Sequence, residues 1–205
     1  MEDIDYLLRA NGLTDILSFD TSIISDVRYS TKNNFSGDIL YPRQFGLYTV
    51  KPLAEAVWGC SRLLKHLFPE LRVVIFDAAR PLSVQRRIFE KVKGTSFEPY
   101  IANPEGEVSG GFHNYGLAID LSICHADGGL LDMGSDYDSF EPVSHPGREL
   151  EFLEKGILNQ EAYSNRMLLY FIAARNGITP HPKEWWHFQL DYSESSKSMY
   201  KLLDF

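Results

Sequence analysis

The segment Tyr115-Gly116-Leu117-Ala118-Ile119-Asp120-Leu121-Ser122-Ile123 has the alternating apolar pattern of a β-strand. The aliphatic side chains at positions 117, 119, 121 and 123 would lie on one face of this strand, and Asp120 would lie on the other. A second apolar run, Arg72-Val73-Val74-Ile75-Phe76-Asp77, also has the composition of a buried strand and ends in a carboxylate. The two segments therefore predict strands of a sheet that carries acidic side chains.

Helical patterns lie on either side of these two strands. Apolar residues recur at helical spacing after Pro52, which suits the first turn of a helix, and Pro69 ends that pattern. A second helix is predicted to begin at Pro81, and a third to run from its cap, Asn159, to Asn176-Gly177. Three amphipathic helices are therefore expected around the sheet.

Two long irregular segments, Gly94–Gly111 and Gly128–Pro146, separate the predicted elements, and a last strand is predicted over His187–Leu190. Loops of this length are often functional. Because strands and helices do not alternate strictly, the pattern favours the α+β class, with a central, mainly antiparallel sheet flanked by helices. A length of 205 residues suits one domain spanning residues 1–205.

The composition excludes several classes of protein. Hydrophobic residues make up 44% of the chain, which is enough for a core and excludes disorder. The net charge of −8 argues against a nucleic-acid partner, because that affinity depends on Lys and Arg. The longest apolar run, Met167–Ala174, is far shorter than the ~20 residues of a membrane-spanning helix, so membrane insertion is not expected.

Compartment and cysteine chemistry are predicted less directly. The start of the chain, Met1-Glu2-Asp3-Ile4-Asp5, carries acids where a secretory signal has cations. This predicts a cytoplasmic protein, or a periplasmic one if a signal has been removed. Cys60 and Cys124 are expected to be buried thiols, although the sequence leaves a single disulfide open.

Three side chains have the chemistry of zinc ligands. His113 and Asp120 are seven residues apart, which is ~23 Å in a straight strand and too far for ligands of one ion. The chain must therefore turn back between them, and Gly116 can supply the bend because glycine adopts a positive φ at little cost. With His187 as a third ligand, a zinc ion would keep a fourth position for water, as in catalytic sites.

Glu184 adds a group that can take the proton of an attacking water molecule. In a regular strand Glu184 and His187 would point to opposite faces, so a turn at Lys183–Trp186 is expected, and Pro182 favours it. Of the two tryptophans at 185 and 186, one is expected in the core and the other against the metal site. Each polar residue taken alone can be an ordinary buried one, but together they supply what one mechanism needs.

Arg80 follows the second strand, in Asp77-Ala78-Ala79-Arg80-Pro81. It can form a helix-entry ion pair with Asp77, which contributes little if it is exposed. Alternatively, its guanidinium can stabilise the oxyanion that forms when water adds to a peptide carbonyl. The sequence position leaves both interpretations open.

Taken together, these motifs resemble those of the zinc D-alanyl-D-alanine dipeptidases and, more broadly, the zinc D,D-carboxypeptidase superfamily with its Hedgehog/D,D-peptidase fold. The similar stretches are Val27-Arg28-Tyr29, Asn34–Gly37, Asp77–Pro81, His113–Asp120, Met133-Gly134-Ser135, Tyr137-Asp138 and Glu184–His187. The resemblance implies hydrolysis of D-alanyl-D-alanine or a similar small dipeptide. The implied roles are one Zn²⁺ on His113, Asp120 and His187, a catalytic base at Glu184, carbonyl and oxyanion polarisation by Arg80, and an amine-binding carboxylate at Asp138.

This chain departs from the family pattern at two positions. Gly111 stands where the family usually has a substrate-binding serine, so that contact is absent or comes from another group such as Ser109. Ala79 stands where the family often has tyrosine. Three alternatives stay open: a D,D-carboxypeptidase or endopeptidase acting on peptidoglycan stem peptides, a non-catalytic zinc-binding module, and a scaffold without metal. The sequence does not predict an oligomeric state.

Overall fold

The protein is described by a computed structural model that covers residues 4–41, 46–106, 109–190 and 193–205. The helices are α1 (Ile4–Ala10), α2 (Lys51–Leu67), α3 (Leu82–Val92), α4 (Glu149–Glu154), α5 (Gln160–Ala174) and α6 (Glu194–Lys197). The strands are β1 (Thr14–Asp15), β2 (Ile24–Ser25), β3 (Tyr48–Thr49), β4 (Leu71–Asp77), β5 (Ala118–His125), β6 (Thr179–His181) and β7 (Glu184–Gln189).

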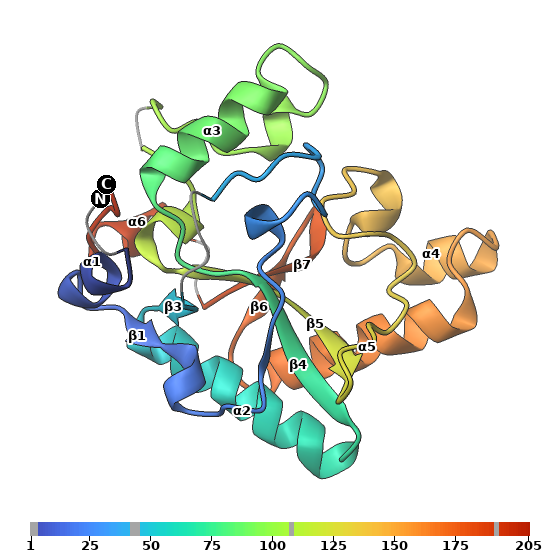
Figure 1. The fold of residues 1–205 in the computed structure, drawn as a ribbon. Coiled ribbons are helices and arrows are strands. Elements are labelled where there is room, and N and C mark those ends of the chain that lie inside the picture. Colours follow the sequence, from blue (N-terminus) through green and yellow to red (C-terminus); the bar gives the residue numbers. More distant parts are fainter. Residues whose placement is uncertain (1–3, 42–45, 107–108, 191–192) are drawn as a thin grey trace.

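The five-stranded sheet has the order β2-β4-β5-β7-β6. Only the β2–β4 pair is parallel among the described strands of this sheet, and β1 pairs with β3 in a separate antiparallel ribbon. Figure 1 shows β4, β5 and β7 at the centre of the molecule, with α2 and α5 alongside them. The prediction of an α+β domain with a mainly antiparallel sheet is confirmed.

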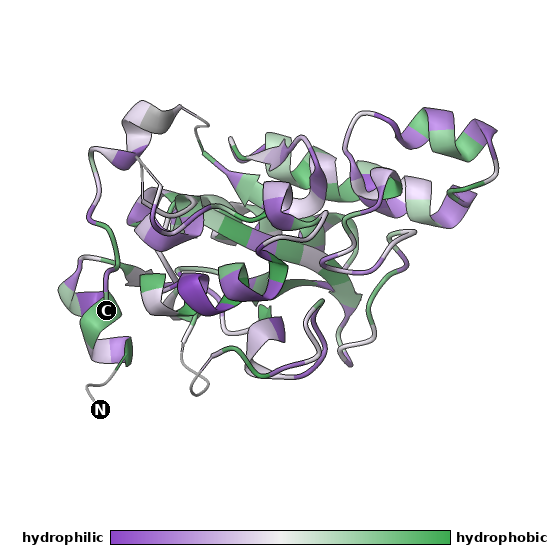
Figure 2. Ribbon diagram, turned by 90° about the horizontal axis from the view of Figure 1, so that it is seen from above, coloured by the Kyte–Doolittle hydropathy of each residue, from purple (hydrophilic) through white to green (hydrophobic). Residues whose placement is uncertain are grey.

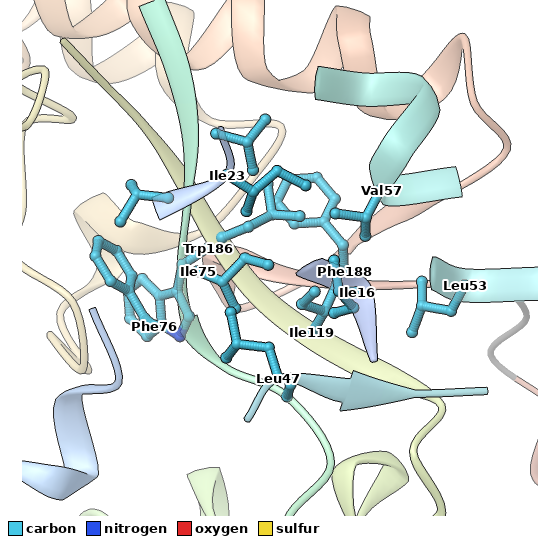
Figure 3. Close-up of a cluster of buried hydrophobic side chains, with 14 of the residues drawn as sticks. Ile16, Ile23, Leu47, Leu53, Val57, Ile75, Phe76, Ile119, Trp186 and Phe188 are labelled. Carbon is cyan, nitrogen blue, oxygen red and sulfur yellow. The ribbon is translucent and has the colours of Figure 1, made fainter. Parts of the chain in front are cut away.

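One face of the sheet packs against α2 and α5, which also contact each other. Ile75, Ile119 and Phe188, on three neighbouring strands, are fully buried on this face and lie close to Leu53 and Val57 of α2 (Figure 3). The strands accordingly form the hydrophobic centre in Figure 2. Burial of each such side chain contributes about 1.5–3 kcal/mol, so this face holds the sheet and helices together. The polar side chains of Asp120, His187 and Gln189 lie on the opposite face.

The long predicted elements are present, with small shifts in their bounds. The Asn159 side chain accepts a hydrogen bond from the Ala162 N–H at 2.7 Å and caps α5 as expected. Two bounds were wrong: β5 begins at Ala118 and not at Tyr115, and β7 begins at Glu184 and not at His187. The two cysteines are buried and free, as predicted. No helix in the described ranges is both long and apolar enough to cross a bilayer.

Candidate metal centre

The turn between His113 and Asp120 is built by a short helix and a glycine. Residues 112–115 form a 3₁₀ helix that ends at Gly116, whose φ of 69° is left-handed. The Gly116 N–H donates to the His113 carbonyl at 3.1 Å, and a Cβ at Gly116 would lie 2.7 Å from Leu13 Cδ2. The bend that the sequence predicted at Gly116 is confirmed, and it replaces the first residues of the predicted strand.

Glu184 and His187 reach the same site by a different route from the predicted one. The predicted turn at Lys183–Trp186 is wrong: the chain reverses one step earlier, between His181 and Glu184. The pairing of β6 with β7 then becomes irregular, since Pro180 pairs with Phe188 while His181 pairs with Glu184. Residues 185–187 are therefore extra on β7. This irregularity brings Glu184 Oε2 within 3.6 Å of His187 Nδ1 despite their spacing of three.

The side chains of His113, Asp120 and His187 converge on one point. His113 Nε2 lies 3.1 Å from His187 Nδ1 and 3.2 Å from Asp120 Oδ1, and the latter two atoms are also 3.2 Å apart. Ligands about 2.0–2.2 Å from a tetrahedral zinc ion are separated by roughly 3.4 Å. The three atoms are therefore spaced as one metal ion requires, and this group can hold one.

The other polar atom of each of these three side chains has a partner that fixes its orientation. His113 Nδ1–H donates to the Ala78 carbonyl at 2.7 Å, His187 Nε2–H donates to Gln189 Oε1 at 3.2 Å, and the Tyr137 hydroxyl donates to Asp120 Oδ2 at 2.9 Å. Each imidazole thus turns its unprotonated nitrogen toward the centre. Three hydrogen-bond acceptors then face one another without a donor between them, which favours a bound cation.

The electrostatics of the centre depend on whether a cation is present. When none is bound, burial acts to raise the pKa of Asp120, yet positive charge and hydrogen bonds donated by His113 and His187 hold this pKa well below its usual value. The pKa of Glu184 lies well above its ordinary value because of burial and then because of the Asp120 and Asp138 carboxylates. Without a cation, the site therefore favours a charged Asp120 and a protonated Glu184 over two charged carboxylates side by side.

Arg80 lies between β4 and α3 and is 6% exposed, and Asp77, the last residue of β4, is 1% exposed. The Arg80 guanidinium donates to Asp77 Oδ2 through Nε at 2.8 Å and Nη2 at 2.5 Å, and to Gln85 Oε1 through Nη1 at 2.7 Å. The ion pair with Asp77 is thus buried, in contrast to the exposed pair of the first interpretation. Arg80 also lines the cavity with N–H groups to spare, since arginine has five donors.

Among the non-glycine residues that the structure describes, Asp138 is the one with a positive φ, at 61°. Its carboxylate accepts hydrogen bonds from the Tyr29 hydroxyl at 3.0 Å and from the Phe35 N–H at 3.4 Å. Burial, followed by the charge of Asp120, raises the pKa of Asp138 to about 7. A buried carboxylate in a strained backbone position is a common feature of functional sites.

All six candidate residues line one cavity of about 710 Å³: His113, Asp120, His187, Glu184, Arg80 and Asp138. A model of peptidase M15, the D-Ala-D-Ala dipeptidase family, matches residues 9–201. The chain belongs to this family.

Two similar proteins carry the same description. A D-alanyl-D-alanine dipeptidase of Escherichia coli K12 is 25% identical over 186 residues, covering 89% of this chain and 86% of the relative. A D-alanyl-D-alanine dipeptidase of a Synechocystis species is 26% identical over 153 residues, covering 61% of this chain and 62% of the relative. The resemblance drawn from the sequence motifs is confirmed at the level of the peptidase M15 family.

One of the two departures from the family pattern, Gly111, lies in the lining of the cavity. Gly111 lies against the loop at Ala102, so that a Cβ at Gly111 would come within 3.1 Å of the Ala102 Cβ. Ser109, the suggested substitute for the family serine, is not among the described residues that line the cavity. This part of the site is therefore formed by Gly111, Phe112 and the neighbouring loop 100–102, in place of a serine hydroxyl.

Both tryptophans are buried in the core, so the expected division between the core and the metal site is only partly present. Trp186 lines the cavity and packs on Tyr137 with a ring-centroid distance of 5.4 Å, and Trp185 donates its indole N–H to Ser135 Oγ at 3.0 Å.

The predictions from sequence missed the hydrogen-bond partners that orient the candidate ligands, above all Gln189 and the Ala78 carbonyl. The position of Gln189, two residues after His187 and on the same strand face, was the available signal for one of them.

Proposed function

We propose that this protein is a zinc dipeptidase that hydrolyses D-alanyl-D-alanine or a similar short dipeptide with a free amino group. The observation that carries the proposal is the convergence of His113 Nε2, Asp120 Oδ1 and His187 Nδ1 beside the carboxylate of Glu184, whose side chain is 13% exposed. The side chains that would hold zinc are these three. Zinc at such a site lowers the pKa of water and polarises a carbonyl group.

Glu184 is the general base of the proposed mechanism. Its carboxylate takes a proton from the attacking water and later gives that proton to the nitrogen of the leaving amino acid. A base must lie within hydrogen-bond reach of the reacting water, and Glu184 Oε2 lies 3.6 Å from a ligand atom of the centre. The Glu184 carboxylate accepts no hydrogen bond from His113 or His187. One ring nitrogen of each histidine faces the centre, and the other donates to a partner outside it.

Arg80 polarises the scissile carbonyl and stabilises its developing negative charge. The hydrogen bonds to Asp77 and Gln85 hold the guanidinium in one orientation, so little reorganisation is needed as charge develops. Loss of a comparable donor in other hydrolases costs about 100–1,000-fold in rate. In this interpretation the buried ion pair with Asp77 serves to aim Arg80.

Asp138 binds the ammonium group of the substrate. Asp138 is 7% exposed, and the hydrogen bonds from Tyr29 and Phe35 fix its carboxylate in the lining of the cavity. A charged amine bound there must leave water, which is favourable only with a close opposite charge. Asp138 therefore favours a free amino terminus one residue from the scissile bond, and so favours dipeptides over stem peptides.

The test is replacement of the proposed base. Glu184→Gln should lower the rate of D-alanyl-D-alanine hydrolysis by about 100–10,000-fold, the usual contribution of a general base, while the protein retains one zinc ion per chain. Release of D-alanine is followed by chromatography and zinc by atomic emission. Glu154→Gln, at the end of α4, is the matched control and should retain full activity. A fully active Glu184→Gln enzyme would contradict the assignment of the base.

The same assay separates the proposal from its alternatives. Wild-type enzyme should release D-alanine from free D-alanyl-D-alanine much faster than from a peptidoglycan stem pentapeptide. The opposite preference would favour a D,D-carboxypeptidase acting on stem peptides. Bound zinc with no hydrolysis of either substrate would favour a non-catalytic module, and absence of zinc would refute the metal site itself.

A further inference from the structure

Four aromatic side chains form a wall beside the cavity, and two of them line it. The Phe140 ring lies at the middle of this aromatic wall, with centroid distances of 5.7 Å to Phe35, 5.1 Å to Phe97 and 5.1 Å to Tyr100. Phe140 and Tyr100 line the cavity, whereas Phe35 and Phe97 do not, and Phe97 is 44% exposed. These ring contacts hold the wall together. The wall is apolar at Phe140, whereas the Tyr100 ring also has the Lys183 ammonium 4.9 Å from its centroid.

The aromatic wall adjoins Asp138. Phe35 donates its backbone N–H to Asp138 Oδ2 at 3.4 Å, and Phe140 follows Asp138 by two residues. The wall therefore begins next to the carboxylate that binds the substrate ammonium in the proposed function. In an amino acid the side chain and the ammonium group are attached to the same α-carbon. A side chain on the first residue must consequently lie within a few bonds of Asp138, beside the wall.

We infer that the aromatic wall is a subsite for an apolar side chain larger than methyl on the first residue of the dipeptide. This inference rests on the proposed function, because it takes Asp138 as the amine site. D-Alanyl-D-alanine has only methyl side chains and cannot cover the Phe140 and Tyr100 rings. The cavity of about 710 Å³ lies within the range of pockets that hold drug-sized ligands, so a bulkier first residue fits its size.

The expected effect follows from the burial of extra methylene groups. One methylene in a hydrophobic pocket typically changes kcat/KM by about 10–200-fold. D-Leucyl-D-alanine should therefore have a kcat/KM at least about tenfold higher than D-alanyl-D-alanine. D-Alanyl-D-leucine, which has the same atoms but carries the large side chain on the second residue, should not show this gain.

A binding measurement tests the subsite without hydrolysis. We would titrate the zinc-loaded Glu184→Gln variant with the three dipeptides by calorimetry, alone and combined with Phe140→Ala. Phe140→Ala should reduce the preference for D-leucyl-D-alanine over D-alanyl-D-alanine by at least about fivefold. Phe171→Ala, which removes an aromatic ring that is 49% exposed on α5, is the matched control and should preserve the preference.

The outcomes distinguish the subsite from the proposed function. Equal binding of D-leucyl-D-alanine and D-alanyl-D-alanine, with wild-type hydrolysis of both, would overturn the subsite and leave the dipeptidase intact. A preference that survives Phe140→Ala would also overturn it. Failure of the wild-type enzyme to hydrolyse any dipeptide would refute the proposed function instead. Circular dichroism of the Phe140→Ala protein checks that it is folded, and Tyr100→Leu gives a second test if it is not.

Discussion

Replacement of Tyr137 by phenylalanine should weaken metal binding without changing a metal ligand. The Tyr137 hydroxyl donates to Asp120 Oδ2 at 2.9 Å and so leaves Oδ1 directed at the centre. Tyr137→Phe removes that hydrogen bond, together with the hydroxyl contact to Tyr29, and keeps the ring that packs between Phe76 and Trp186. Among the three candidate ligands, the change therefore acts on the orientation and solvation of the Asp120 carboxylate.

The magnitude can be worked from this contact. A hydrogen bond to a charged group contributes about 1.5–3 kcal/mol, and about 1.4 kcal/mol corresponds to a factor of ten in an equilibrium constant. Partners that orient metal ligands typically contribute 10–100-fold to metal affinity or activity, which is the same range. We therefore expect Tyr137→Phe to raise the Kd for zinc by about 10–100-fold, measured by competition with a chromophoric chelator.

The chain offers a closely matched control. The Tyr170 hydroxyl donates to Glu149 Oε1 at 2.8 Å, in a tyrosine–carboxylate contact that involves none of the three ligands. Tyr170→Phe should lower the free energy of unfolding by about 1.5–3 kcal/mol, the contribution of a hydrogen bond to a charged group, and leave the Kd for zinc unchanged. The reasoning is refuted if Tyr137→Phe binds zinc within twofold of the wild type, or if Tyr170→Phe weakens zinc binding equally.

Two further predictions concern the turn and the buried acid. Gly116→Ala should lower the free energy of unfolding by about 1–3 kcal/mol through backbone strain, and by a further amount through the clash of the new Cβ with Leu13. Gly12→Ala is the control, because φ is also positive there but the space is open, and it should show only the loss from strain. Chemical denaturation measures both free energies. In the zinc-free protein the folded state holds a proton on Asp138 up to about pH 7, whereas the unfolded chain loses that proton near pH 4. The free energy of unfolding should therefore fall as pH rises between these two values. Asp138→Asn should flatten that fall, and an unchanged slope would show that Asp138 is not the group responsible.

The long elements could be predicted because their side chains repeat over enough residues to show a period. The strands β4 and β5 and the helices α2, α3 and α5 each span seven residues or more, and their buried faces match the sequence pattern. The strands β1, β2 and β3 span two residues each, and α4 spans six. Segments this short have no period of their own, so their structure comes from pairing and packing with distant parts of the chain.

The three candidate metal-binding side chains could be predicted from residue type, and the bend between His113 and Asp120 from Gly116. The route by which Glu184 reaches them could not be predicted. The sequence required Glu184 and His187 to share a face, and a turn was the simplest way to achieve that. The structure uses irregular pairing between β6 and β7 instead, which depends on Pro180 pairing with Phe188. Such a register shift arises from contacts across the sheet and leaves little trace in the local sequence.

The strained backbone of Asp138 and the position of Arg80 are connected through one side chain. Tyr29 donates its hydroxyl to the Asp138 carboxylate, and its ring lies under the Arg80 guanidinium at 5.1 Å. A left-handed φ at a non-glycine residue costs on the order of 1 kcal/mol, although Asp tolerates it better than most. Glycine would relieve that strain and remove the carboxylate. In the proposed mechanism Asp138 binds the amine of the first residue of the substrate, and Arg80 binds the carbonyl of the same residue. Because Tyr29 contacts both side chains, it fixes the spacing that a dipeptide must match. In that mechanism the backbone strain at Asp138 is tolerated because this spacing selects the substrate.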